Sequence, residues 1–328
     1  MSRSVRRILL GLGGVLVSAA AAGAVVFLRQ EPTRPGMLAA AQRSLAAMPL
    51  VRERGALAPW RVGIQAGHWK IEELPDELRR LRGDTGAQWG RLTEAQVNLA
   101  IAERVAGQLR EAGVSVDLLP ATIPVSYDAD ALVAIHADDG GGSNERGWKI
   151  AAPWRSSAAS RSLRDFLARA YGGVIDIPED RYGVSFNMRG YYAFSWTRFE
   201  HAVAPSTPAA IIETGFLTSA ADRQIIVDDP ERVARAISLG VLAYLGELAH
   251  MPPAARMPVV YPPMVVASDL APLRFFPGDT ERILARVPAG TRVRAMDEEN
   301  GWVDLVVAGH FREFGWMKAT DLGTPEGG

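Results

Sequence analysis

The chain has 328 residues, enough for one sizeable domain and a smaller one. Its 36 basic and 37 acidic residues give a formal net charge of −1 at pH 7, so the composition makes no electrostatic case for nucleic-acid binding. The lack of cysteine excludes disulfides, zinc–thiolate sites and cysteine nucleophiles. Any metal must therefore be held by carboxylates and by some of the five histidines.

The first segment, residues 1–29, contains an uncharged apolar run over residues 8–28 that follows three arginines. This run is long enough to span a bilayer, and the leading arginines favour keeping the N-terminus in the cytoplasm. Small residues at positions 19–24 leave a cleavable signal peptide open as an alternative. We therefore expect the remainder to be exported, either membrane-anchored facing the cell wall or secreted after cleavage, with residues 30–59 as a spacer.

Three apolar runs each end on a residue that can bind a metal or transfer a proton. They are residues 62–66 followed by His68, residues 131–135 followed by His136, and residues 209–212 followed by Glu213. Such runs predict strands of a parallel sheet buried on both faces, whose carboxyl ends meet at one edge. One histidine after a strand is more commonly structural, but two favour a shared metal site. A carboxylate arriving from the same direction suits a general base.

Glu94 lies at the start of a predicted helix. Thr93 and Gln96 around it have the capping-box pattern, and Gly113 follows where the helix should end. The partial positive charge of a helix N-terminus favours an ionised Glu94, which suits a metal ligand. The alternative is an ordinary first-turn glutamate that stabilises the helix.

Segments with helical periodicity alternate with these strands. A further helix is expected around residues 163–170, and Asp229-Pro230 is a typical start for a helix that ends near residue 250. The alternation predicts an α/β domain over residues 60–250, with a mostly parallel sheet flanked by helices on both faces.

Five residues are candidate substrate contacts. Asn187, Arg189 and Tyr191 belong to a polar and aromatic segment that could line a cleft, although packing is an alternative for the aromatic rings. Trp69 directly follows the first histidine of the predicted site, and His201 precedes the third strand.

The C-terminal part changes character. Residues 251–263 are rich in proline and predict a linker, and residues 264–328 contain short alternating runs. Asn300-Gly301 between two such runs is a strong hairpin signal. We expect a small all-β barrel here.

Over residues 60–249 the chain resembles the zinc-dependent N-acetylmuramoyl-L-alanine amidases of bacterial cell-wall turnover. The motifs that carry the resemblance are Ala66-Gly67-His68, Glu94 with residues 97–101, residues 134–138, and residues 213–217. The resemblance implies that His68, Glu94 and His136 bind Zn²⁺ and that Glu213 is catalytic. The C-terminal part resembles a bacterial SH3-like module.

The resemblance implies zinc-dependent hydrolysis of the amide bond between N-acetylmuramic acid and L-alanine in peptidoglycan. Two alternatives remain. One is a catalytically inactive amidase-like protein that binds cell wall or a partner, and the other is a zinc amidohydrolase that acts on a different amide.

Overall fold

The computed structural model describes residues 59–141, 145–309 and 313–325. All of these belong to one compact unit of the chain. The predicted membrane or signal segment and residues 30–58 of the predicted spacer lie outside this described part. Among the helices that the structure describes, none combines the length and the apolar character needed to cross a bilayer.

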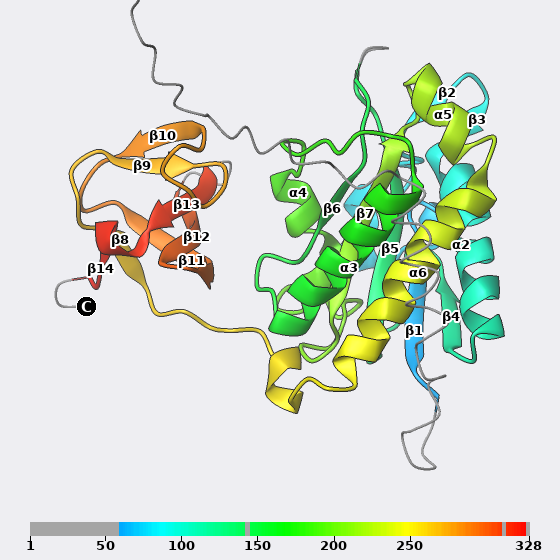
Figure 1. Cartoon of the computed structure of the whole chain (residues 1–328), viewed down its shortest axis with the longest axis horizontal. Helices are drawn as coiled ribbons and strands as arrows, with labels where there is room; N and C mark the ends of the chain where they lie inside the picture. Colours follow the sequence, from blue (N-terminus) through cyan, green and yellow to red (C-terminus); the bar gives the residue numbers. More distant parts are fainter. Residues whose placement is uncertain (1–58, 142–144, 310–312, 326–328) are drawn as a thin grey trace, which may run out of the picture. The chain divides into compact units, whose positions relative to one another are not determined.

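A five-stranded sheet forms the centre of the larger domain (Figure 1). In spatial order its strands are β4 (Ser115–Leu119), β1 (Arg61–Ala66), β5 (Ala131–Asp138), β7 (Ala209–Phe216) and β6 (Lys149–Ala151). The first four run parallel, and β6 pairs antiparallel with β7. The prediction of a mostly parallel sheet is therefore confirmed.

The long helices all pack on one face of this sheet. They are α2 (Glu94–Glu111), α3 (Ala158–Val174) and α6 (Pro230–Leu248). Their apolar residues share one core with every second strand residue, such as Val133 and Ile135 of β5. Figure 1 shows α3 and α6 lying side by side across the strands. The predicted helix starts are present, because Thr93 and Gln96 form a capping box and Asp229 caps α6.

The opposite face is covered differently from the prediction of helices on both faces. The alternate residues of β5, Leu132 and Ala134, pack in a second core under short helices and loops. The short elements are η1 (Ile71–Glu73), η2 (Asp76–Leu81), α4 (Phe186–Arg189) and η3 (Tyr192–Phe194). Buried side chains such as Leu78 and Tyr192 are spaced too irregularly in the sequence to predict a helix.

Smaller elements complete the domain and lead out of it. They are the hairpin strands β2 (Gln88–Trp89) and β3 (Leu92–Thr93), α5 (Ala220–Ile226) after β7, and η4 (Pro253–Arg256) in the predicted linker.

The C-terminal part is an antiparallel sheet with its own apolar core, as the alternating pattern predicts. In spatial order its strands are β10 (Ile283–Val287), β9 (Ala271–Arg274), β13 (Phe314–Lys318), β12 (Trp302–Val307), β11 (Arg292–Glu299), β8 (Met264–Val266) and β14 (Leu322–Gly323), with η5 (Ala319–Asp321) before β14. Asn300 and Gly301 join β11 to β12 with φ of 49° and 79°, the left-handed values that a tight hairpin turn needs. The resemblance of this sheet to SH3-like modules stays a prediction.

The packing of α6 on α3 depends on Gly240. A Cβ atom at Gly240 would lie 2.8 Å from the Cα of Leu167, whereas a Cβ at Gly107 of α2 would meet nothing within 4 Å. We therefore expect Gly240→Ala to lower the free energy of unfolding by about 1–3 kcal/mol through overpacking. Gly107→Ala, the matched control, should raise it by up to about 1 kcal/mol through helix propensity. Urea unfolding of the full chain measures both changes. If the two substitutions stabilised the protein equally, the close packing of α6 on α3 would not depend on Gly240.

Candidate functional site

Three of the predicted site residues meet at the carboxyl edge of the central sheet. His68 follows β1, His136 lies near the end of the adjacent parallel strand β5, and Glu94 is the first residue of α2. Each offers a ligand atom, and these atoms all lie within 4.8 Å of one another. The convergence follows from the parallel register, which brings the ends of β1 and β5 to one place.

Two glycines make room for this cluster. A Cβ atom at Gly67 would lie 2.3 Å from the His136 ring, so the chain can turn here only without a side chain. Gly86 has a φ of +73°, and a Cβ there would lie 2.0 Å from a carboxylate oxygen of Glu94. His68 itself adopts a φ of 61°, a left-handed conformation that is unusual for a residue with a side chain. The local backbone is therefore shaped around the three side chains.

The Glu94 carboxylate is buried and held by several donors. The backbone N–H groups of Ala87 and Ala137 donate to it at 2.9 Å and 3.1 Å. Asn98, one helical turn along α2, donates to Glu94 at 3.1 Å and to the carbonyl of Gly67 at 3.0 Å. The carboxylate thus connects the loop before α2, the helix itself and β5.

The pKa of Glu94 reflects two opposing effects. Burial favours the neutral acid, but the hydrogen bond with His136 and the electrostatic interactions with His136 and His68 lower the pKa to about 2. The group is therefore ionised at neutral pH. A divalent cation held by neutral imidazoles would supply positive charge here.

The cluster fits a zinc ion by its donor chemistry. Nδ1 of His68 donates to the carbonyl of Asp84 at 2.6 Å, which leaves Nε2 free to present a lone pair 3.5 Å from Glu94. Nδ1 of His136 lies 2.9 Å from the other oxygen of Glu94. Two imidazoles and one carboxylate are a common protein ligand set for a zinc ion that keeps a position open for substrate or water.

Glu213 enters the site from the third strand. It lies opposite His136 in the β5–β7 register. Its Oε2 atom is shielded from solvent and has no hydrogen-bond partner among the described residues. Burial and the negative charges of Glu94 and Asp138 raise its pKa well above the ordinary range, against the lowering effect of Lys149. A carboxyl group with a raised pKa can carry a proton near neutral pH and pass it to a leaving group, which suits a residue that transfers protons.

Lys149 is a residue that the sequence analysis missed. It lies opposite Glu213 in β6 and forms ion pairs with Asp138 and Asp180, at 3.0 Å for the latter. These ion pairs hold a positive charge beside Glu213. The strand that carries Lys149 has only three residues and no sequence pattern of its own, so only the antiparallel pairing reveals the position.

The candidate substrate contacts fall into two groups. Asn187 and Tyr191 line a cavity of about 350 Å³ together with His68 and His136, and the Tyr191 hydroxyl lies 3.4 Å from Nε2 of His136.

Three other candidates lie outside the lining of that cavity. Trp69 packs against the main apolar core, and His201 is 2.7 Å from Glu77. Arg189 forms an ion pair with Asp304 of the C-terminal sheet and lines a neighbouring cavity instead. The positions of Trp69, Arg189 and His201 in the sequence did not indicate that they lie outside the cavity at His68 and His136.

The fold and this edge of the sheet are typical of a hydrolase that combines a metal ion with a carboxylate base. The family model for N-acetylmuramoyl-L-alanine amidase matches residues 62–243, more than half of the chain. The chain therefore belongs to the N-acetylmuramoyl-L-alanine amidase family, as its motifs indicate.

Solved structures of such amidases are similar to the chain over a little more than half of its length. The amidase from Clostridium difficile 630 is 20% identical with a TM-score of 0.41, and the match covers 57% of this chain and 97% of that chain. AmiC2 of Nostoc punctiforme is 23% identical with a TM-score of 0.40, over 57% and 97% of the two chains. The catalytic domain of CwlV from Bacillus (Paenibacillus) polymyxa var. colistinus is 22% identical with a TM-score of 0.38, over 57% and 98%. No curated protein sequence gives a significant match.

Zinc binding should depend on the cluster and not on histidine in general. The full chain, stripped with a chelator and dialysed against Zn²⁺, is expected to retain one zinc ion. His136→Gln should weaken zinc affinity by more than about 10-fold, because even the loss of an outer partner of a ligand has an effect of that size. His201→Gln is the matched control and should bind like the wild type. Zinc content and far-UV circular dichroism measure binding and folding, and equal affinities of the two variants would contradict the assignment.

Proposed function

We propose that this protein is a zinc-dependent hydrolase of the amide bond between N-acetylmuramic acid and L-alanine in peptidoglycan. The observation that carries the proposal is the placement of Glu213, with its unpartnered carboxyl oxygen, beside the cluster of His68, Glu94 and His136. Membership in the amidase family supports the choice of substrate.

In this proposal His68, Glu94 and His136 hold the zinc ion. Zinc, when bound, supplies Lewis acidity toward the scissile carbonyl and toward water. Glu213 takes a proton from the attacking water at its unpartnered oxygen and returns it to the nitrogen of the leaving L-alanine. The raised pKa of Glu213 supports the second step, because the acid form must persist until the amine leaves. Lys149 moderates that pKa from the neighbouring strand.

Tyr191 and Asn187 would contact the substrate in this scheme. Both line the cavity that contains His68 and His136, and the Tyr191 hydroxyl can donate a hydrogen bond into it. Their place in the cavity supports positioning of the polar glycopeptide beside the zinc ligands.

The proposed substrate lies outside the cytoplasmic membrane, and the sequence of residues 1–29 supports export. We propose that the enzyme works at the cell wall, either anchored by this segment or released after its cleavage. The C-terminal sheet, by its resemblance to SH3-like modules, is proposed to keep the enzyme on the wall.

The two alternatives make different demands on the site. A protein that only binds cell wall needs neither a complete ligand set nor a proton-transfer group, and here all four positions carry suitable side chains. A zinc amidohydrolase for another amide would use the same chemistry, and it is distinguished by cleavage of acylated amino acids in preference to muropeptides.

Glu213→Gln tests the catalytic assignment. The variant keeps the shape of the side chain and should bind zinc normally, but hydrolysis of a defined muropeptide should fall by about 10²-fold or more because proton transfer is lost. The measurement is mass-spectrometric detection of the released peptide with the zinc-loaded full chain.

Glu103→Gln is the matched control, since Glu103 is exposed on α2. It should leave hydrolysis unchanged. Full activity of Glu213→Gln would refute the role of Glu213, and a wild-type protein that binds peptidoglycan but neither holds zinc nor cleaves would favour the binding-protein alternative.

A further inference from the structure

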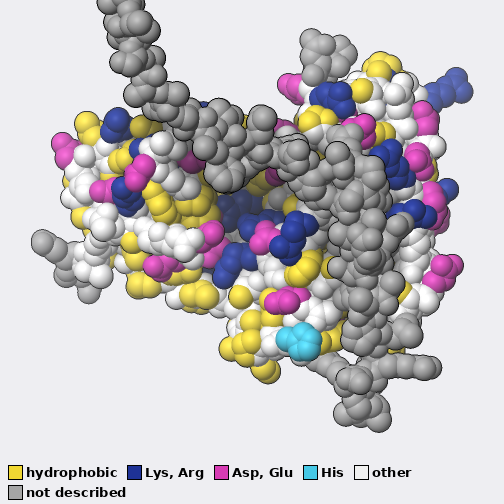
Figure 2. Space-filling model, in the orientation of Figure 1, with side chains coloured by type: hydrophobic (Ala, Val, Ile, Leu, Met, Phe, Trp, Pro, Cys, Tyr) yellow, Lys and Arg dark blue, Asp and Glu magenta, His cyan; other side chains and the backbone are white. Residues whose placement is uncertain are grey.

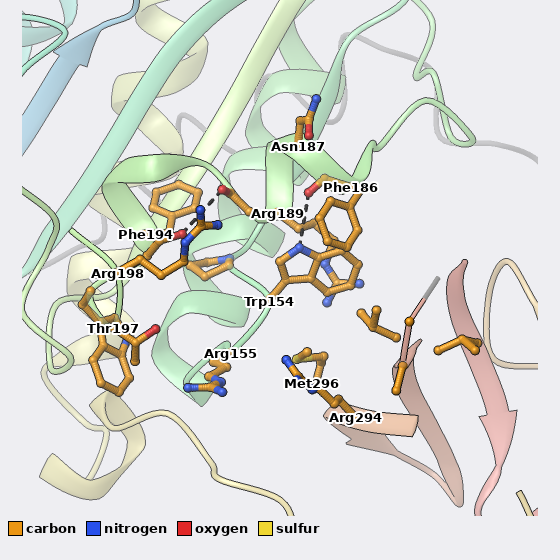
Figure 3. Close-up of a pocket in the computed structure, with 18 of the residues that line it drawn as sticks. Trp154, Arg155, Phe186, Asn187, Arg189, Phe194, Thr197, Arg198, Arg294 and Met296 are labelled. Carbon is orange, nitrogen blue, oxygen red and sulfur yellow. Dashed lines mark hydrogen bonds between the residues drawn. The ribbon is translucent and has the colours of Figure 1, made fainter. Parts of the chain in front are cut away.

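A second cavity of about 520 Å³ adjoins the one at the metal cluster. Arg80, Asn187 and Gly190 contribute to the lining of both cavities, so the two are neighbours. Its walls come from the loop after β6, from α4 and the segment after η3, and from strands β11 and β12 of the C-terminal sheet. Figure 3 shows Trp154, Arg155 and Arg198 on the wall formed by the larger domain, and Arg294 and Met296 on the wall formed by the C-terminal sheet.

This second cavity is strongly basic although the chain as a whole is nearly neutral. Among the described residues that line it there is no acidic side chain, and there are five arginines, which are Arg80, Arg155, Arg189, Arg198 and Arg294. In Figure 2 a group of Lys and Arg side chains lines the hollow at this place. Arg189 forms an ion pair with Asp304, whereas the other four form no ion pair with any described residue, although Arg80 and Arg198 lie over the ring of Phe199. Unpaired guanidinium groups gathered in one cavity favour an anionic ligand.

The two walls are fixed to each other by buried polar contacts. Asp304 of β12 is 1% exposed and pairs with Arg189 of α4. Asp297 of β11 is also buried and lies 2.9 Å from Arg161 of α3. Burying a charge without a partner is costly, so these pairs define one orientation of the C-terminal sheet. Arg294 is thereby held across the cavity from Arg155.

The chemistry of the proposed substrate says which part of it is anionic. In N-acetylmuramoyl-L-alanine the carboxyl group of the muramic acid is consumed in the scissile amide, so the sugar side carries no carboxylate. The peptide side carries at least the carboxylate of its own C-terminus. Arginine binds carboxylates through two parallel hydrogen bonds, which fits this side of the substrate.

We propose that the cavity formed by Arg80, Arg155, Arg198 and Arg294 is a subsite for the carboxylates of the peptide that leads away from the scissile bond. This inference rests on the proposed function. The C-terminal sheet thus contributes a wall of the substrate site through Arg294, and the enzyme prefers stem peptides with free carboxylates over amidated ones.

The test compares two soluble muropeptides that differ only in charge, one with free carboxylates and one with the same groups amidated. The zinc-loaded wild type should cleave the acidic form with about 10-fold higher kcat/KM, the size of one lost charge-assisted contact. The double variant Arg155→Gln/Arg294→Gln should lose this preference and cleave the two forms with similar kcat/KM. Arg235→Gln, an exposed arginine on α6, is the control and should behave as wild type.

Equilibrium binding separates the subsite from the catalytic proposal. Calorimetry with the free peptides, acidic and amidated, should show tighter binding of the acidic form to wild type and equal binding of both forms to the double variant, whether or not the bond is cleaved. Cleavage of both muropeptides at equal rates with equal binding would overturn the subsite and leave the amidase function standing. Tighter, arginine-dependent binding of poly(glycerol phosphate) than of the acidic peptide would overturn the peptide as occupant.

Discussion

The buried carboxylate of Glu94 is the interaction on which this site depends. It receives hydrogen bonds from the loop before α2, from α2 itself and from the backbone of β5, and both histidines face it. A carboxylate in this position would be unstable without positive charge nearby, and the two imidazoles or the proposed zinc ion provide that charge. The glycines at positions 67 and 86 leave the space that the arrangement needs. The ionised state of Glu94 therefore depends on the hydrogen-bond donors at this edge of the sheet, and the loops at this edge are in turn held in place by the Glu94 carboxylate.

The second organising constraint is the orientation of the C-terminal sheet. Two buried carboxylates, Asp297 and Asp304, each require a positive partner, and the larger domain supplies both partners from α3 and α4. The same contacts place α4 between the two cavities, because Asn187 and Gly190 line both. The proposed zinc site and the arginine-lined cavity are thus parts of one surface, and they share residues of α4 and its C-terminal end as well as Arg80 of η2.

The sequence predicts the central sheet because its strands are continuous apolar runs, and it predicts α2 and α6 because their caps are local patterns. His68, His136 and Glu213 were placed together in advance since parallel strands end at one edge. Glu94 required the resemblance as well, because a first-turn glutamate is common in helices. The cover of the second sheet face was not predictable, since η1, η2, α4 and η3 are too short to show a period.

By itself the sequence determined the alternation of the main parallel strands with the long helices, the residue types available to hold a metal, and the membership in the amidase family. These depend on patterns within one segment or on motifs in a fixed order. The tertiary structure alone decided that Lys149 lies beside Glu213, that Arg189 pairs with Asp304, and that Arg155 and Arg294 face one cavity. Each of these contacts joins residues from separate elements. The periodicity of side chains along one strand or helix shows which face is buried, but it does not show which residues of another element pack against that face.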